Sequence, residues 1–154
     1  MAISPNTDFS AGAILTATQQ NQFPRGVMQF VQTTGTTVAT GTEAVVLTLP
    51  SFTAVANRYY RITYFEPYFE TLATNVEISL RIRLTNLTGT VQGRGQTFIS
   101  GLNAEGQCIA TVVKTLTAGS TVLVATIQTT GGSCNAYGDA TYPRQLWVED
   151  IGPA

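Results

Sequence analysis

The chain has 154 residues, which is room for one domain, and a chain of this length buries about 70% of the surface that its unfolded form exposes. It carries 8 basic and 9 acidic residues and no histidine, for a formal net charge of −1. No basic stripe is available to neutralise phosphates, and no run approaches the roughly 20 apolar residues of a membrane span, so neither nucleic acid nor a membrane is expected as a partner.

The composition predicts a surface that is neutral and rich in hydroxyl groups. Charged residues make up 11% of the chain, against about 25% in an average protein, whereas threonine occurs 26 times. Threonine packs well in strands, and few charges need desolvation when another subunit or another protein covers such a surface. The N-terminus lacks the basic and apolar regions of a signal peptide, so we expect synthesis in the cytosol.

An N-terminal arm with only two charged side chains, residues 1–25, precedes a β-domain that is predicted to span residues 26–154. Thr16 followed by Gln19 fits a capping box, so residues 17–23 are predicted to form one or two helical turns before a proline. So short a helix is not stable alone in water. The arm is therefore expected to dock on another surface.

Three apolar side chains of the arm are the candidate docking residues, because they have no obvious place in the core of the domain. They are Ile14, Leu15 and Phe23. Their partner is either the domain of the same chain or another subunit, and the sequence leaves both open.

Eight segments have the period of two that is typical of strands, separated by glycine and asparagine. They are residues 26–32, 43–49, 58–66, 76–85, 95–100, 107–116, 120–129 and 144–151. Regular spacing without a helical pattern predicts an all-β fold, an antiparallel β-sandwich of the jelly-roll type with about eight strands. Residues 130–143 are predicted to form a long surface loop, the kind of segment that often carries function.

The segment RYYRITYFEPYFE, residues 58–70, has aromatic side chains on both faces of the predicted strand. In a monomeric sandwich one of these faces would meet water, so burial on both sides favours an oligomer. Trimeric jelly rolls of the tumour-necrosis-factor-like fold place such aromatics along their three-fold axis. The candidate residues for the oligomer interface are Tyr59, Tyr64 and Phe65.

Groups that could act in catalysis are scarce, and we expect the chain not to be an enzyme. The absence of histidine removes the commonest general base and rules out Ser-His-Asp and Cys-His arrangements. Glu66 and Glu70, beside the aromatics, are the one close carboxylate pair that fits a glycosidase or a sugar site, but cross-strand pairing with arginines explains such charges equally well. Gly93 and Gly95 do not belong to a phosphate loop and are interpreted as a turn.

No cofactor or metal site is expected either. Cys108 and Cys134 are the only thiols, and without histidine they do not make a credible zinc site. They are interpreted as two buried small side chains, with a disulfide formed after release from a cell as the alternative.

The chain resembles a family of small virion structural proteins of tailed bacteriophages, in the order and composition of segments along most of its length rather than in a functional motif. The segments are LTATQQNQFPRGVM (residues 15–28), FTAVANRYYRITYFEP (52–67), RIRLTN (81–86) and YPRQLWVEDIGPA (142–154). Members of this family are described as decoration, minor tail or head-fibre proteins. The resemblance implies a structural role in the virion, and small decoration proteins are commonly trimers whose N-terminal segments reach onto the shell.

Two functions follow from these observations. The first is a capsid decoration, or cement, protein that is made in the host cytoplasm, trimerises and holds the major capsid protein on the capsid surface through its arm. The alternative is a tail or head-fibre module that recognises a glycan of the host surface. The candidate contacts for a glycan are Tyr68, Tyr137 and Tyr142.

Overall fold

The computed structural model describes residues 12, 14 and 16–154, apart from the side chain of Thr18. Leu15, one of the three predicted docking residues, lies outside the described residues. The elements are α1 (Ala17–Gln20), β1 (Gly26–Thr33), β2 (Gly35–Ala39), β3 (Ala44–Ala54), β4 (Arg58–Thr71), β5 (Val76–Leu84), β6 (Val91–Ile99), β7 (Glu105–Thr115), β8 (Gly119–Thr130), β9 (Cys134–Gly138) and β10 (Arg144–Pro153).

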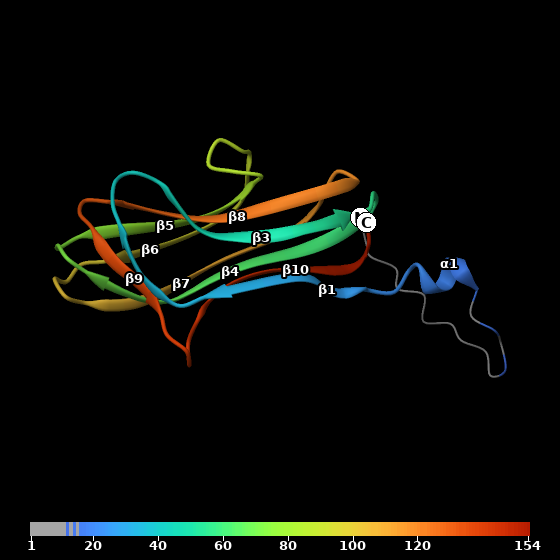
Figure 1. Cartoon of the computed structure of the whole chain (residues 1–154), viewed down its shortest axis with the longest axis horizontal. Helices are drawn as coiled ribbons and strands as arrows, with labels where there is room; N and C mark the ends of the chain where they lie inside the picture. Colours follow the sequence, from blue (N-terminus) through green and yellow to red (C-terminus); the bar gives the residue numbers. More distant parts are fainter. Residues whose placement is uncertain (1–11, 13, 15) are drawn as a thin grey trace.

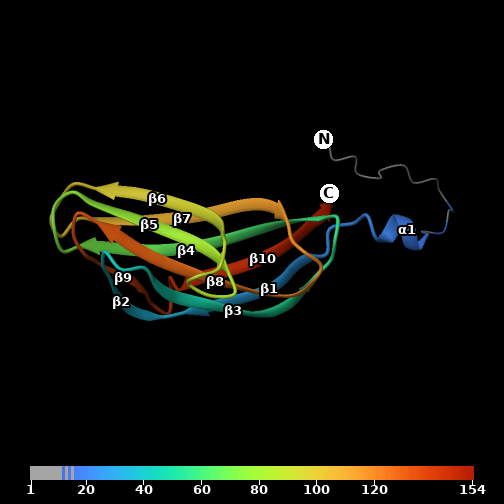
Figure 2. The ribbon, with the colours of Figure 1, turned by 90° about the horizontal axis from the view of Figure 1, so that it is seen from above.

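The strands form two antiparallel sheets that lie one over the other (Figures 1 and 2). The larger sheet has the order β1-β10-β4-β9-β2, and β7 also pairs with β4, whereas the smaller sheet has the order β3-β8-β5-β6. The prediction of an antiparallel β-sandwich of the jelly-roll type is confirmed. Helix α1 projects from one end of the sandwich, the end at which the C-terminus lies (Figure 1).

Eight of the ten strands in the described part of the chain correspond to the predicted segments. The sequence did not indicate β2 and β9, which have five residues each and contain glycine. These two strands pair with each other over their whole length, and β9 also pairs with the end of β4. Pairing with neighbouring strands, and not the local sequence, therefore stabilises β2 and β9.

The core lies between the sheets and is built by strict alternation. On β5, Val76, Ile78, Leu80 and Ile82 are fully buried, and each such side chain contributes about 1.5–3 kcal/mol when it leaves water. Tyr64 of β4 belongs to this core with an exposed fraction of 0%, so its assignment to an oligomer interface is wrong. It lies two positions from other core residues of β4 and therefore points to the same side of the sheet.

Gly93 and Gly95 lie inside β6, so their interpretation as a turn is also wrong. A Cβ atom added to Gly95 would lie 2.1 Å from the carbonyl oxygen of Ile109 on β7, and one added to Gly93 would lie 2.9 Å from Val112 Cγ1. The glycines are needed because β6 and β7, which belong to different sheets, approach closely and close the sandwich along this edge.

A β-bulge in β4 determines how the functional surfaces are arranged. Glu66 lies opposite Cys108 and Phe69 lies opposite Gly106, so Pro67 and Tyr68 together oppose one residue of β7. The face on which successive side chains lie therefore changes at this point. Before the bulge the even-numbered residues face the core, and beyond it Phe69 faces the core while Tyr68 faces outward.

Candidate functional site

The outer face of the larger sheet carries a row of apolar side chains, which we call the apolar face. Its members are Val27, Phe30, Tyr59, Phe65, Ile109, Val113 and Trp147. Phe30 lies opposite Trp147, and Phe65 lies opposite Ile109. Val27, Phe30, Ile109 and Val113 are 61%, 43%, 53% and 50% exposed, so a single chain leaves them largely uncovered.

The smaller sheet carries charges on its outer side instead. Arg83 donates two hydrogen bonds to the Glu43 carboxylate, at 2.6 and 2.7 Å, and the Arg81 guanidinium lies 3.2 Å from the same carboxylate. The hydrogen bonds from Arg83 lower the pKa of Glu43. Arg94 and Glu77 form a looser pair at 3.7 Å. The outer side of the smaller sheet therefore carries two groups of ion pairs, whereas that of the larger sheet carries the row of apolar side chains.

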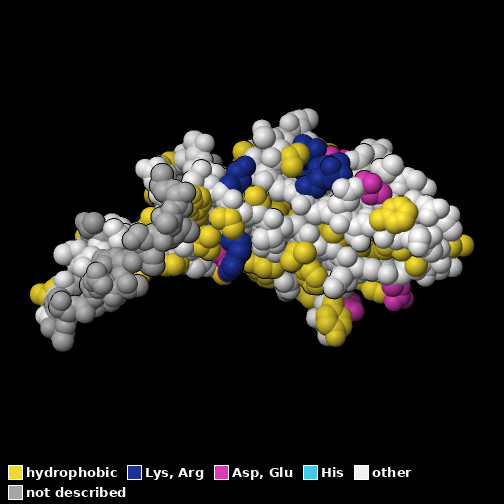
Figure 3. Space-filling model, turned by 180° about the vertical axis from the view of Figure 1, so that it is seen from behind, with side chains coloured by type: hydrophobic (Ala, Val, Ile, Leu, Met, Phe, Trp, Pro, Cys, Tyr) yellow, Lys and Arg dark blue, Asp and Glu magenta, His cyan; other side chains and the backbone are white. Residues whose placement is uncertain are grey.

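Two of the predicted interface residues, Tyr59 and Phe65, lie on the apolar face. The Arg61–Glu149 ion pair, at 2.5 Å, lies on the same side of the sheet, and it raises the pKa of Arg61 and lowers that of Glu149. Sequence reasoning missed the members on β1, β7 and β10, although the alternation of each strand was the signal that would have identified them. Seen from behind, the molecule shows scattered hydrophobic side chains on a surface that is mostly neither hydrophobic nor charged, with a few basic and acidic groups (Figure 3).

The arm forms the predicted capping box at the start of α1. Thr16 Oγ1 accepts a hydrogen bond from the Gln19 backbone at 3.2 Å, and Gln19 Oε1 accepts one from the Thr16 backbone at 2.9 Å. The helix is shorter than predicted and ends at Gln20. Ile14 is 90% exposed and Phe23 is 40% exposed, so the domain of the same chain does not cover Ile14.

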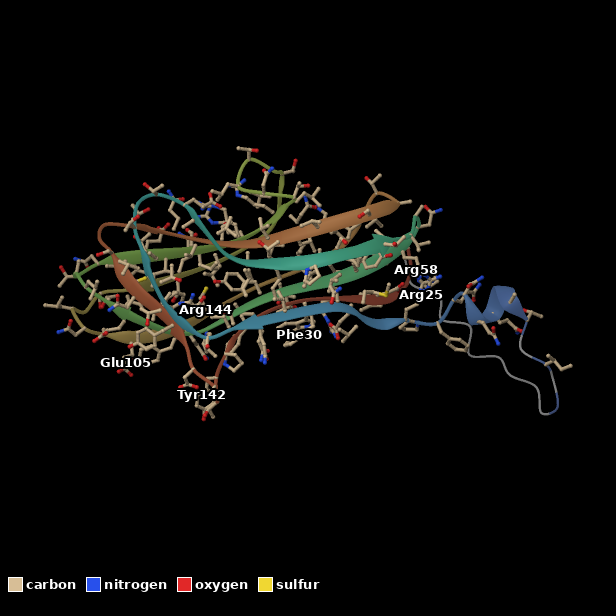
Figure 4. All side chains as sticks on the ribbon, viewed as in Figure 1. Arg25, Phe30, Arg58, Glu105, Tyr142 and Arg144 are labelled. Atoms are coloured by element: carbon tan, nitrogen blue, oxygen red, sulfur yellow. The ribbon has the colours of Figure 1, made fainter. Side chains whose placement is uncertain are left out.

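The root of the arm is bound to its own domain by Arg58, the first residue of β4. The Arg58 guanidinium donates to the carbonyl oxygens of Asn21 at 2.5 Å and Phe23 at 2.6 Å. It also donates from Nε and Nη2 to the Asp150 carboxylate, whose side chain is fully buried. Figure 4 places Arg58 and Arg25 at the end of the sandwich next to α1. One buried guanidinium thus joins the arm to β10.

The three tyrosines predicted to contact a glycan lie around one cavity of about 390 Å³, which we call the tyrosine pocket. The pocket is lined by Phe65, Pro67, Tyr68, Gln107, Tyr137, Asp139 and Tyr142. The rings of Tyr68 and Tyr137 have centroids 4.3 Å apart and planes inclined by 35°. Tyr142 is 66% exposed, so much of its ring is available to a ligand.

Hydrogen bonds hold the walls of the tyrosine pocket in place. Asp139 Oδ1 accepts from the backbone nitrogens of Thr141 and Tyr142, both at 2.7 Å, which closes the turn that carries Tyr142. The Tyr68 hydroxyl is hydrogen-bonded to the Glu105 carboxylate and to Tyr137, and these bonds raise the pKa of Tyr68 above its ordinary value. Tyr68 faces the pocket because the β-bulge turns it outward.

The two glutamates that fitted a catalytic pair lie on opposite faces of β4. Glu66 is fully buried and accepts hydrogen bonds from Arg144 Nε at 2.7 Å and from the Tyr64 hydroxyl at 2.6 Å. Glu70 lies beyond the bulge and faces outward, 3.5 Å from the Tyr137 hydroxyl. The bulge therefore separates these carboxylates, and the structure does not bring them to one site.

Burial raises the pKa of Glu66 to about 6, although Arg144 and the Tyr64 hydrogen bond act in the opposite direction. Arg144 is also buried, and it donates to Thr37 Oγ1 at 2.7 Å. Cys108 and Cys134 are both free and buried, as the first interpretation of the sequence predicted, and burial raises the pKa of Cys134 to about 12.

The described residues also bear on two other kinds of feature, a metal site and a membrane-spanning helix. They contain no group of three or more cysteine, aspartate or glutamate side chains placed to hold a metal ion. They also contain no helix with the length and apolar character needed to cross a membrane.

No family model matches the chain, and no curated protein matches it. Among solved structures, Eiger TNF from S. frugiperda is similar, with a TM-score of 0.56 and 9% identity over 84% of this chain and 96% of that chain. This likeness shows the fold, a jelly roll of the tumour-necrosis-factor type.

Two other solved structures are more distant. The carbohydrate-binding module TmCBM61 in complex with β-1,4-galactotriose has a TM-score of 0.35 and 9% identity, covering 77% of this chain and 67% of that chain. The enzymatically active domain of tailspike protein 4 from bacteriophage CBA120 has a TM-score of 0.29 and 10% identity, covering 77% of this chain and 19% of that chain. Scores below 0.5 do not establish a shared fold, so no assignment rests on these two.

Proposed function

We propose that the chain is a non-catalytic structural protein of a bacteriophage virion, a capsid decoration protein that assembles as a homotrimer and binds the major capsid protein through its N-terminal arm. The observation that carries the proposal is the apolar face, together with the arm that projects beside it. The sequence resemblance to phage virion proteins supplies the setting, the capsid surface.

Other copies of the same chain are the proposed partners of the apolar face. The contrast between the two sheets supports this, because charged residues are depleted at the cores of interfaces and aromatic residues are enriched there. The likeness of fold to Eiger TNF is the reason for proposing a trimer in preference to another oligomer.

The arm is the proposed contact with the shell. It leaves the domain at one end of the sandwich (Figure 1), and Ile14 is an apolar side chain that its own domain leaves exposed. Three arms on one trimer would bind a lattice much more tightly than one arm, because the second and third contacts form within one complex.

Ile109→Glu is expected to convert the trimer into monomers, because the new carboxylate would be buried without a partner in the apolar face. Association should weaken by about a hundredfold or more, as measured by sedimentation equilibrium, while the circular dichroism spectrum stays unchanged. Phe98→Glu is the matched control, since Phe98 is 61% exposed but lies on β6 of the smaller sheet. An Ile109→Glu protein that assembles like wild type would remove the apolar face from the proposal.

Deletion of residues 1–20 is expected to abolish binding to capsids while the trimer still forms. This deletion removes α1 but keeps the carbonyl groups of Asn21 and Phe23 that bind Arg58, so the end of the domain stays intact. A longer deletion, of residues 1–24, also removes these carbonyl groups. Comparison of the two deletions therefore separates binding to the shell from the attachment of the arm to Arg58. Binding is measured by cosedimentation with capsids that lack the protein. If the truncated trimer binds as well as the full chain does, the arm is not the shell contact.

The second candidate function is recognition of a glycan of the host surface by a tail or head-fibre module. The tyrosine pocket favours it, because the structure brings together Tyr68, Tyr137 and Tyr142 from two strands and a loop. The number of copies in each virion separates the two functions, since hundreds of copies fit decoration of the shell and a handful fit a tail tip.

A further inference from the structure

We propose that the tyrosine pocket binds an uncharged glycan and discriminates against acidic ones. This inference rests on the second candidate function, glycan recognition, and it specifies the class of ligand and the residues that select it.

The pocket offers ring faces of the kind on which a sugar stacks. Tyr68 and Tyr137 form one wall, with ring centroids 4.3 Å apart, and the exposed ring of Tyr142 forms another part of the rim. The face of an aromatic ring carries partial negative charge and therefore attracts the C–H groups on the apolar side of a pyranose. Sites for small ligands have volumes of about 300–1,000 Å³, and this cavity, at about 390 Å³, suits a short stretch of sugar rings.

The polar groups around these rings suit hydroxyl groups. The exposed Gln107 side chain on β7 has an amide that both donates and accepts hydrogen bonds. Asp139, which directly follows β9, adds a carboxylate, and this group only accepts hydrogen bonds. A few fixed polar groups among aromatic walls give a site orientation as well as affinity.

The charged side chains that line the pocket or bond to its tyrosines are all acidic, and this carries the choice of ligand. Asp139 lines the pocket, the Glu105 carboxylate is hydrogen-bonded to Tyr68, and Glu70 lies 3.5 Å from the Tyr137 hydroxyl. None of the seven lining residues is lysine or arginine. A carboxylate or sulfate on a sugar would meet these three acids without a cation to pair with, and like charges disfavour binding.

The pocket is built before a ligand arrives, and it lies away from the arm. The bulge places Tyr68 on the outer face, and the Asp139 turn fixes the backbone at Tyr142, so little ordering of the backbone is needed on binding. Tyr142 and Glu105 lie toward the end of the sandwich remote from Arg58 and Arg25 (Figure 4). Binding at this pocket and docking of the arm therefore use separate parts of the chain.

The test uses the full-length protein on a printed array that carries neutral, sialylated, uronic acid-containing and sulfated oligosaccharides. We expect binding to neutral oligosaccharides and a preference of about tenfold or more over their acidic counterparts. Tyr142→Ala and Tyr68→Ala are each expected to weaken binding about tenfold, since each removes one stacking surface. Phe98→Ala, which removes a similarly exposed ring from the smaller sheet, should leave binding unchanged.

A second variant tests the charge argument directly. Glu105→Gln keeps the size of the side chain and an oxygen that can accept from the Tyr68 hydroxyl, but removes one of the three negative charges, so the ratio of neutral to acidic binding should fall. Tyrosine-dependent binding that favours acidic glycans would overturn the inference and leave glycan recognition standing. If binding of neutral oligosaccharides survives both tyrosine substitutions, the tyrosine pocket is not the binding site. An array without any bound glycan would overturn the inference and the second candidate function together, while the decoration function would be unaffected.

Discussion

Replacing Arg58 with methionine is expected to lower the free energy of unfolding by about 3–5 kcal/mol and to release the root of the arm. The change leaves the fully buried Asp150 carboxylate without its main partner and removes the donors to the carbonyl groups of Asn21 and Phe23. Stability is measured by urea denaturation. Release of the arm is measured by limited trypsin digestion, which should cut faster after Arg25.

Arg61→Met is the matched control for this substitution, because it makes the same chemical change on the same strand. The Arg61 side chain is 50% exposed, and loss of its pair with Glu149 should change stability by about 0–1 kcal/mol. Asp150→Asn separates the two effects, since it weakens the ion pair but leaves Arg58 able to hold the arm. Equal stability of the Arg58→Met and Arg61→Met proteins would contradict the role assigned to Arg58.

Replacing Arg144 with methionine is expected to be as severe at neutral and higher pH, with a loss of about 3–5 kcal/mol, because buried Glu66 then has no cation beside it and must either carry an unpaired charge or take up a proton at a cost in free energy. The loss should be smaller at pH 5. Without Arg144 the pKa of Glu66 rises further, so this carboxyl group takes up a proton at low pH and becomes neutral in the core. Urea denaturation at pH 5 and pH 8 measures the difference.

The wild-type protein should show the same dependence in a weaker form. Because the folded pKa of Glu66, about 6, lies above its ordinary value of 4.5, the folded state binds the extra proton between these values. The stability that comes from this group is therefore highest below about pH 4.5, falls as the pH rises through 6 and is then lower by up to about 2 kcal/mol.

Glu66→Gln provides the control for the pH effect. It also leaves a buried charge, but neither glutamine nor arginine titrates in this range, so the stability of this variant should lack the fall between pH 5 and pH 8 that Glu66 gives the wild type. A double substitution, Glu66→Leu with Arg144→Met, removes both charges and should cost less than either single change. An Arg144→Met protein whose loss does not depend on pH would show that Glu66 does not take up a proton in the fold.

The sequence was sufficient for the fold class because alternation is a local property. The alternation of apolar and polar residues from Val76 to Leu84 is enough to identify the buried face of this strand. Each of the eight strands predicted in this way is present in the structure. Strands β2 and β9 were missed because five residues with glycine carry too little pattern, and they form only when each has the other as a partner. Gly95 was misinterpreted because its role is to allow contact with a strand 14 positions away in sequence, at Ile109.

The candidate site was only partly predictable, for a geometric reason. Tyr68, Tyr137 and Tyr142 were chosen for their ring chemistry, and the structure brings them together. Alternation puts Tyr64 on the face of the strand opposite to Tyr59 and Phe65, so the three candidates for the interface could not share one surface. The bulge at Pro67 and Tyr68 was beyond sequence reasoning, because it depends on the register with β7 and β9. Arg58 and its partners were also missed, since Asp150 is 92 positions away.

Strand β4 holds the root of the arm, the apolar face and the tyrosine pocket in one fixed register, and this limits how the chain can change in length. Arg58 stands at its first residue, Phe65 in its middle and Tyr68 just past the bulge. A single inserted residue between Arg58 and Phe65 would turn Arg58 to the outer face and separate it from Asp150, because side chains alternate along a strand. Insertions should therefore be tolerated in the Asp139–Tyr142 turn and not in β4. Related chains are expected to vary the pocket rim freely while they keep the spacing from Arg58 to Tyr68.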